Sequence, residues 1–210
     1  MGYLEPVDTT ISIIERVGLL DKLLLKFISS SKKAWQSLAE ALNEIEKSTT
    51  ALRDALLAVS NISVVEPVTS DVAKELDNLA SGVLEISVQK AKGSCHRIGE
   101  IYDTYLSGIL SNFVQSKFLN STEVGELEGL FYDLSKSDAS FLEIAQIISG
   151  RLREVSESIR THLENKDSLK AKEIISALHN ESIEKAKRLN AVLVKMIELQ
   201  GEFAKKSGSI

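Results

Sequence analysis

The residue types that carry catalysis or bind metals are few and poorly spaced in this 210-residue chain. Cys95 and His96 are adjacent, so on a helix their side chains would point about 100° apart and could not share one ligand or proton. His162 and His179 lie 17 positions apart, with no carboxylate–histidine pair around them. We interpret the histidines as helix-surface residues and Cys95 as a partly buried thiol.

One group of carboxylates could in principle bind a metal ion. It contains Glu123, Glu126, Glu128 and Asp133, but it lacks the Glu-x-x-His spacing of helical di-metal sites, so we interpret it as a solvated helix face. The sequence also has no glycine-rich phosphate loop and no zinc-ligand spacing. We therefore predict that the protein is not an enzyme and that it uses no metal and no cofactor.

The composition narrows the classes of partner. Lys and Arg total 25 against 30 Asp and Glu, a net charge of −5, which argues against a nucleic-acid partner. A hydrophobic fraction of 43% is typical of a folded protein. The single cysteine excludes an intrachain disulfide and indicates a reducing compartment. We expect a cytoplasmic protein that can associate peripherally with a membrane, because no apolar run approaches the ~18 residues of a membrane span.

Long helices are the elements that this sequence favours, since it contains only two prolines, Pro6 and Pro67. The first predicted helix covers about residues 8–60 and has an apolar seam with alternating spacings of four and three, the spacing of helices that pack lengthwise. Its members are Leu38, Leu42, Ile45, Thr49, Leu52, Leu56 and Val59. Trp35 lies next to this seam, and we expect it to be buried.

Two more helices are expected within a single helical domain, 1–210. Pro67 and the capping residue Thr69 predict a loop over 61–69. The second helix would cover about 70–136 and the third about 139–206, with a turn near 137–140 and a glycine stop at Gly208. These two helices have similar lengths, so we expect them to form an antiparallel hairpin. The predicted fold is therefore all-α, with three long antiparallel helices in a coiled-coil-like bundle.

A rod of three such helices would leave its apolar seams exposed, which favours an elongated homodimer in which a second copy covers them. The residues expected in this dimer interface are Leu38, Leu42, Ile45, Leu52, Leu56, Leu193 and Met196.

Basic residues are most frequent in the third predicted segment. Residues 138–210 hold 12 basic and 11 acidic side chains, whereas residues 61–137 hold 6 and 11. The candidates for binding an anionic lipid surface are Arg151, Arg153, Arg160, Lys166, Lys170 and Lys172. The alternative is a helix face on which these cations pair with neighbouring carboxylates.

This layout resembles the BAR (Bin/amphiphysin/Rvs) domain family. The resemblance lies in the three long helices, the loop of about ten residues after the first, and the matched hairpin. Two stretches of the second predicted helix are similar to the middle helix of that family, namely Leu76-x-x-Leu79-Ala80 and the aliphatic and aromatic run 101–113. Asp138 stands where the family often has an acidic residue. The resemblance implies a dimeric scaffold that binds or senses curved anionic membrane.

Three functions follow as hypotheses. The first is the BAR-like homodimer on a membrane. The second is a helical scaffold that binds protein partners, such as small GTPases or trafficking proteins, without a lipid role. The third is a helical bundle that binds a small ligand, which would require an internal pocket with convergent polar groups.

Overall fold

The computed structural model describes residues 2–21, 32–62, 68–82, 97, 99–101, 103–104, 107–108 and 121–208. The elements in chain order are α1 (Glu5–Glu15), the 3₁₀ segment η1 (Arg16–Leu20), α3 (Lys32–Ser60), α4 (Ser70–Ser81), α7 (Ser121–Glu164) and α8 (Ser168–Ser207). Over the described residues the secondary structure is helical and contains no strand, so the predicted all-α class is confirmed.

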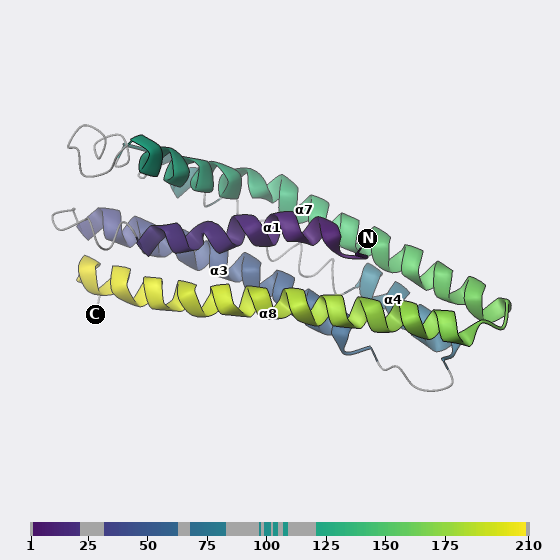
Figure 1. The fold of residues 1–210 in the computed structure, drawn as a ribbon. Coiled ribbons are helices and arrows are strands. Elements are labelled where there is room, and N and C mark those ends of the chain that lie inside the picture. The colour runs from purple at the N-terminus through teal and green to yellow at the C-terminus, as the bar shows by residue number, and fades with distance from the viewer. Residues whose placement is uncertain are drawn as a thin grey trace.

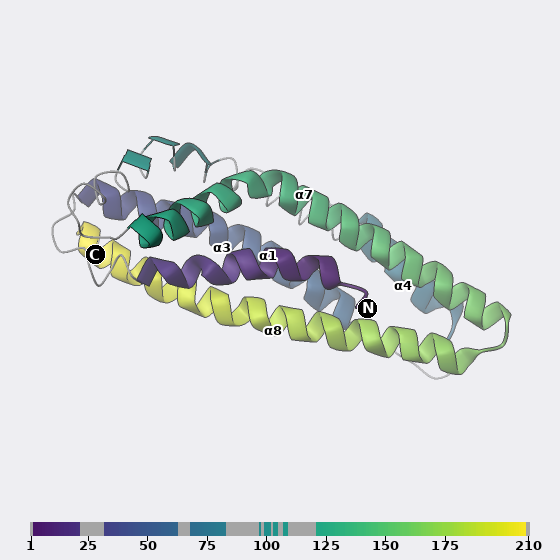
Figure 2. The ribbon, with the colours of Figure 1, turned by 45° about the horizontal axis from the view of Figure 1, so that its top comes forward.

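The helices form an elongated bundle whose two long edges are α7 and α8 (Figures 1 and 2). At 1.5 Å per residue, the 44 residues of α7 and the 40 residues of α8 span about 66 Å and about 60 Å. α3 packs along α8, and α4 packs on α7. The buried apolar side chains of all these elements join in one continuous core.

The seam predicted for residues 38–59 is the buried face of α3. Trp35 is also buried, as predicted, with 3% of its surface exposed, and its ring lies 5.3 Å from the ring of Phe203 on α8. Gln200 of α8 donates a hydrogen bond to Glu46. These contacts place the start of α3 beside the end of α8, so the two helices are antiparallel.

The prediction of one helix over about 8–60 is wrong. α1 runs in the same direction as α8, since Asp8 contacts Lys185 and Asp21 contacts Lys195, whereas α3 runs in the opposite direction. The chain therefore reverses between residues 21 and 32. The physical reason is burial: α1 and η1 have their own apolar face, which lies against α7 and α8. Its fully buried members are Leu4, Val7, Ile11, Ile14, Val17 and Leu20.

The predicted turn near 137–140 is also wrong, and with it the bounds 70–136 and 139–206. α7 is helical throughout 121–164, and the turn of the long hairpin lies at 165–167. Ser and Asp are capping residues, but inside a helix they cost only tenths of a kcal/mol, so they do not force an end. At the observed turn Lys166 has a left-handed φ of 59°, and the Asp167 carboxylate accepts a hydrogen bond from the backbone N–H of Lys170.

The remaining predicted ends agree with the helices. α3 ends at Ser60 and α4 begins at Ser70, with Thr69 as the N-cap whose side chain accepts from the Asp71 N–H. α8 ends at Ser207, and Gly208 follows in the left-handed conformation with a φ of 73°. Of the stretches that carried the BAR resemblance, Leu76, Leu79 and Ala80 lie in α4, and most of the run 101–113 lies outside the described residues.

Candidate interaction surfaces

The residues considered for catalysis do not converge. Cys95 and His96 lie outside the described residues, and His162 and His179 belong to different helices, α7 and α8. In the predicted acidic group, Asp133 accepts a hydrogen bond from Arg16 at 2.6 Å. Among the described side chains, no group of three or more His, Cys, Asp and Glu is arranged to bind a metal ion.

The lipid-binding candidates lie on α7, in the 165–167 turn and on the first turns of α8. Arg151, Arg160 and Lys170 each form an ion pair within the chain. Arg151 contacts Glu154 at 2.6 Å, and Lys170 contacts Glu173 at 2.7 Å. Arg160 donates to both Asp77 of α4 and Glu157. Arg153, Lys166 and Lys172 have exposed side chains.

The pairing of Arg160 with Asp77 has a structural role. Burial alone would raise the pKa of Asp77, but the Arg160 guanidinium and the Ser156 hydroxyl hold that pKa below its ordinary value. Two further contacts tie the same helices together: Ser156 donates to the Ala73 carbonyl at 2.8 Å, and Ser149 to the Ala80 carbonyl at 2.5 Å. Arg160 is therefore part of the α4–α7 interface.

The end of the α7–α8 hairpin, residues 160–173, combines cations with an exposed apolar side chain. Leu169 is 76% exposed and follows the turn that contains Lys166. Lys170 and Lys172 are its neighbours on the first turns of α8. We call residues 160–173 the hairpin end; in Figure 1 it is where α7 meets α8, at the end of the bundle opposite the C-terminus.

The residues expected in a dimer interface are buried inside one chain. All seven have exposures of 6% or less, and they pack in the common core: Leu38, Leu42, Ile45, Leu52, Leu56, Leu193 and Met196. The assumption of a three-helix rod was wrong, because α1 adds a further helix beside α7 and α8 and the chain covers its own seams. A second copy is not needed to cover these residues, and the homodimer remains a prediction without that support.

α1 is held to α8 by a network of charged residues that sequence reasoning missed. Lys185, whose side chain is 6% exposed, contacts Asp8 at 2.6 Å and Glu181 at 3.7 Å. Arg188 contacts Asp8 at 2.7 Å and donates to both carboxylate oxygens of Glu15. Glu15 raises the pKa of Arg188, since its carboxylate stabilises the charged guanidinium. No sequence signal identifies the contacts between α1 and α8, because their partners lie more than 170 positions apart.

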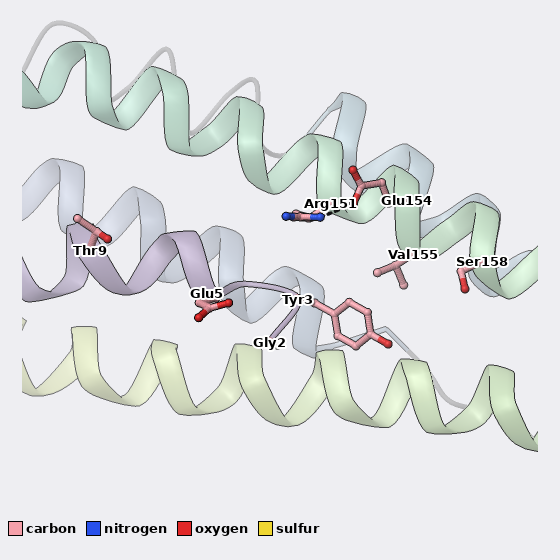
Figure 3. Close-up of a pocket in the computed structure, with 8 residues that line it drawn as sticks. All are labelled: Gly2, Tyr3, Glu5, Thr9, Arg151, Glu154, Val155 and Ser158. Carbon is pink, nitrogen blue, oxygen red and sulfur yellow. Dashed lines mark hydrogen bonds and ion pairs between the residues drawn. The ribbon is translucent and has the colours of Figure 1, made fainter.

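A cleft of about 470 Å³ opens between the start of α1 and α7 (Figure 3). Tyr3 and Val155 supply apolar surface, and the Arg151–Glu154 ion pair lies at its edge. Glu5, Thr9 and Ser158 add polar groups. Because the guanidinium of Arg151 already pairs with a carboxylate, the cleft gives little support to the small-ligand hypothesis.

The outward face of α8 carries apolar side chains in water. Val194 is 52% exposed and Ile197 57% exposed, one helical turn apart. Val194 belongs to a set of residues with spacings of three and four, on the side of α8 opposite the core, and Ile197 lies beside this set. We call this set the outer strip; its members are Glu184, Lys187, Ala191, Val194, Glu198, Gly201 and Lys205. Only Ala191 and Val194 of these residues are apolar, so no apolar repeat in the sequence marks this face.

Gly201 leaves open space on this strip, since a Cβ built there would have no neighbour within 4 Å. Ala191 is likewise small and exposed. A helix laid across the strip could therefore approach α8 closely at these two positions.

Among the described helices, none combines the length and apolarity that crossing a lipid bilayer would require. No family model, no curated protein and no solved structure matches this chain.

Proposed function

We propose that this chain is a helical protein–protein interaction module that binds its partner through the outer strip of α8. The observation that carries the proposal is the exposure of Val194 and Ile197, each more than half accessible on a helix whose other large apolar side chains beyond residue 170 are buried or partly buried. Burying two such side chains in an interface would contribute a few kcal/mol. Exposed apolar side chains grouped on one face are typical of docking surfaces.

The surroundings of the strip favour a protein partner. Its charged members have both signs, with Glu184, Lys187, Glu198 and Lys205 spread along the helix. A surface of mixed sign offers little net attraction to an anionic bilayer, but it can select the register of a helical partner. This supports the scaffold hypothesis over the membrane hypothesis for α8.

Position-specific photocrosslinking in the cells from which the protein comes tests this proposal. A benzophenone amino acid at Val194 should give a covalent adduct with a protein. The same probe at Glu157, an exposed position on α7, is the matched control and should not give that adduct. The absence of a protein adduct at Val194, with the chain folded and expressed, would contradict the proposed function.

A second candidate function has its own support. The hairpin end presents Leu169, 76% exposed, together with Lys166, Lys170 and Lys172, and an apolar side chain among cations suits the surface of an anionic membrane. The BAR-like membrane hypothesis therefore becomes that of a cytoplasmic protein that associates peripherally with an anionic membrane through its hairpin end. The pairing of Arg151, Arg160 and Lys170 with carboxylates weakens it relative to the first proposal.

A further inference from the structure

We propose that the occupant of the outer strip is a second copy of this chain, whose α8 packs antiparallel on the first. This inference rests on the proposed function, because it names the partner of the same surface. The resulting homodimer differs from the one expected from the sequence. Its interface is the outward face of α8, whereas the expected interface residues are buried in the core of one chain.

The length and period of the strip fit helix–helix packing. From Glu184 to Lys205 its seven members follow one face of α8 in spacings of three and four, with Ala191 and Val194 near the middle and charged residues toward both ends. The strip covers about 32 Å of helix at 1.5 Å per residue. In both views α8 forms one long edge of the bundle, so a second copy can approach it along its length (Figures 1 and 2).

The order of charges along the strip selects the antiparallel direction. Glu184 and Lys187 lie before Val194, and Glu198, Glu202 (next to the strip) and Lys205 lie after it. On each side of Val194 the charges therefore run from negative to positive along the chain. In an antiparallel pair, Glu184 faces Lys205 of the second copy, and Lys187 faces Glu202 of the second copy. In a parallel pair each of these residues would face its own like charge, which is unfavourable.

One two-fold axis between the two copies is consistent with both charge pairs. Both pairs are centred between residues 194 and 195, and a two-fold axis requires all pairs to share one centre. That axis lies beside Val194, so the exposed valines of the two copies meet at the middle of the interface. Ala191 on one side keeps the helices close, and Ile197 flanks the contact.

The contacts already made within the chain are compatible with this pairing. Glu202 and Lys205 form an ion pair at 2.8 Å, yet their side chains remain 50% and 65% exposed. The hydrogen bond from Lys205 lowers the pKa of Glu202, so this carboxylate is charged at neutral pH and can accept from Lys187 of the second copy as well.

Cysteine crosslinking tests the direction of packing. In a Cys95→Ser background, Val194→Cys should form a disulfide-linked dimer under mild oxidation, because the two copies of residue 194 meet at the axis. Lys205→Cys should not form one, because its counterpart is Glu184 of the second copy. A mixture of Glu184→Cys and Lys205→Cys chains should crosslink. If the Val194→Cys and Lys205→Cys variants, each tested by itself, both formed disulfide-linked dimers, the two helices would be parallel. That result would overturn the proposal.

Analytical ultracentrifugation of the purified full chain tests whether the outer strip forms the dimer interface. The wild type should have twice the 23.0 kDa mass of one chain at micromolar concentration. Val194→Lys should give a folded monomer whose cooperative melting, unlike that of the wild type, does not depend on protein concentration. Leu169→Lys, at an exposed site on α8 outside the strip, should remain dimeric. Glu184→Lys or Lys205→Glu should weaken dimerisation about tenfold, and the double exchange should restore it to within about threefold.

The outcomes separate this inference from the proposed function. A wild-type monomer at 100 μM, or a dimer that Val194→Lys leaves intact, overturns the second copy as the occupant. If photocrosslinking at Val194 then yields a different protein, the proposed function stands and only the present inference fails. If neither a dimer nor a protein adduct is found, both fail.

Discussion

Lys185 of α8 lies in the core of the bundle, and its ammonium nitrogen contacts the carboxylate of Asp8, on α1, at 2.6 Å. The two residues are 177 positions apart, and the side chain of Lys185 is 6% exposed. A buried ammonium without a counter-charge is costly, so α1 must be docked for α8 to be stable in this form. The contact links the first helix of the chain to the last.

Asp8→Asn should lower the free energy of unfolding by about 2 kcal/mol. The substitution leaves Lys185 buried beside Glu181 alone, at 3.7 Å, and it also removes a partner of Arg188; removing one member of a buried ion pair typically costs about 3–5 kcal/mol, and the partial exposure of Asp8 reduces this. Urea denaturation followed by circular dichroism measures the change. Glu5→Gln, an exposed site on the same helix, is the control, and an equal loss in both variants would contradict the assigned role of Asp8.

Phe203→Ala should destabilise the chain by about 3–4 kcal/mol, because it empties a fully buried site in the core. The ring of Phe203 lies 5.3 Å from that of Trp35, so the emission of this tryptophan, the only one in the chain, should also shift to longer wavelength. Fluorescence during urea unfolding reports both effects. Leu169→Ala, at a site that is 76% exposed, should change the stability by no more than about 0.5 kcal/mol.

Acidification should weaken the α4–α7 interface through Asp77. The Arg160 and Ser156 contacts hold the pKa of this carboxyl below its ordinary value although burial opposes them, so its contribution to stability is fully present above the ordinary value. That contribution is lost as the pH falls through the lowered pKa. Unfolding free energies measured from pH 6 to pH 3 should therefore fall less steeply in Asp77→Asn, and Arg160→Met should have a similar effect. A wild-type slope in both variants would exclude this pair as a source of acid sensitivity.

Binding to anionic vesicles should depend on the hairpin end if the second candidate function holds. Replacing Lys166, Lys170 and Lys172 by Gln removes three cations at about 1 kcal/mol each, which should weaken co-sedimentation with phosphatidylserine vesicles about 100-fold. Binding should also disappear at 1 M salt, where the Debye length is about 3 Å. Arg151→Gln is a control away from the hairpin end. Wild-type protein that remains in the supernatant at low salt would exclude this candidate.

The cations of α7 are less suited to that experiment. Arg160→Glu would place a carboxylate against Asp77 and disturb the α4–α7 interface, so a loss of binding could not be assigned to lipid. Charge reversal at Arg160 would therefore change the fold as well as any contact with lipid.

Two glycines of the last helix should respond in opposite ways to alanine. Gly208 has a left-handed φ of 73°, so Gly208→Ala should cost about 1 kcal/mol. Gly201 is inside α8 with open space around its missing Cβ, so Gly201→Ala should stabilise the monomer by about 0.5–1 kcal/mol. Thermal unfolding at a fixed protein concentration compares the two, and a gain in stability for Gly208→Ala would show that the cap conformation is not required.

The sequence by itself determined the helical class, the buried face of α3 and several helix ends. The periodic apolar residues from Leu38 to Val59 and the burial of Trp35 could be predicted because side chains on one helix face share one environment. Thr69 and Gly208 could be predicted as helix-terminal residues because their preferences are local. The spacing of the outer-strip residues places them on one face of a helix. The sequence alone could not show that this face of α8 is exposed to solvent.

Only the tertiary structure decided where the chain turns and which charges are paired. Capping signals near 137–140 and at 165–167 differ by about 1 kcal/mol at most, whereas burying the apolar faces of α1, α7 and α8 is worth many times that. The long-range fold therefore selected the turn at Lys166 and the reversal after α1. The partners Asp77–Arg160 and Asp8–Lys185 follow from that packing, since residues far apart in the chain become neighbours only after the helices have docked.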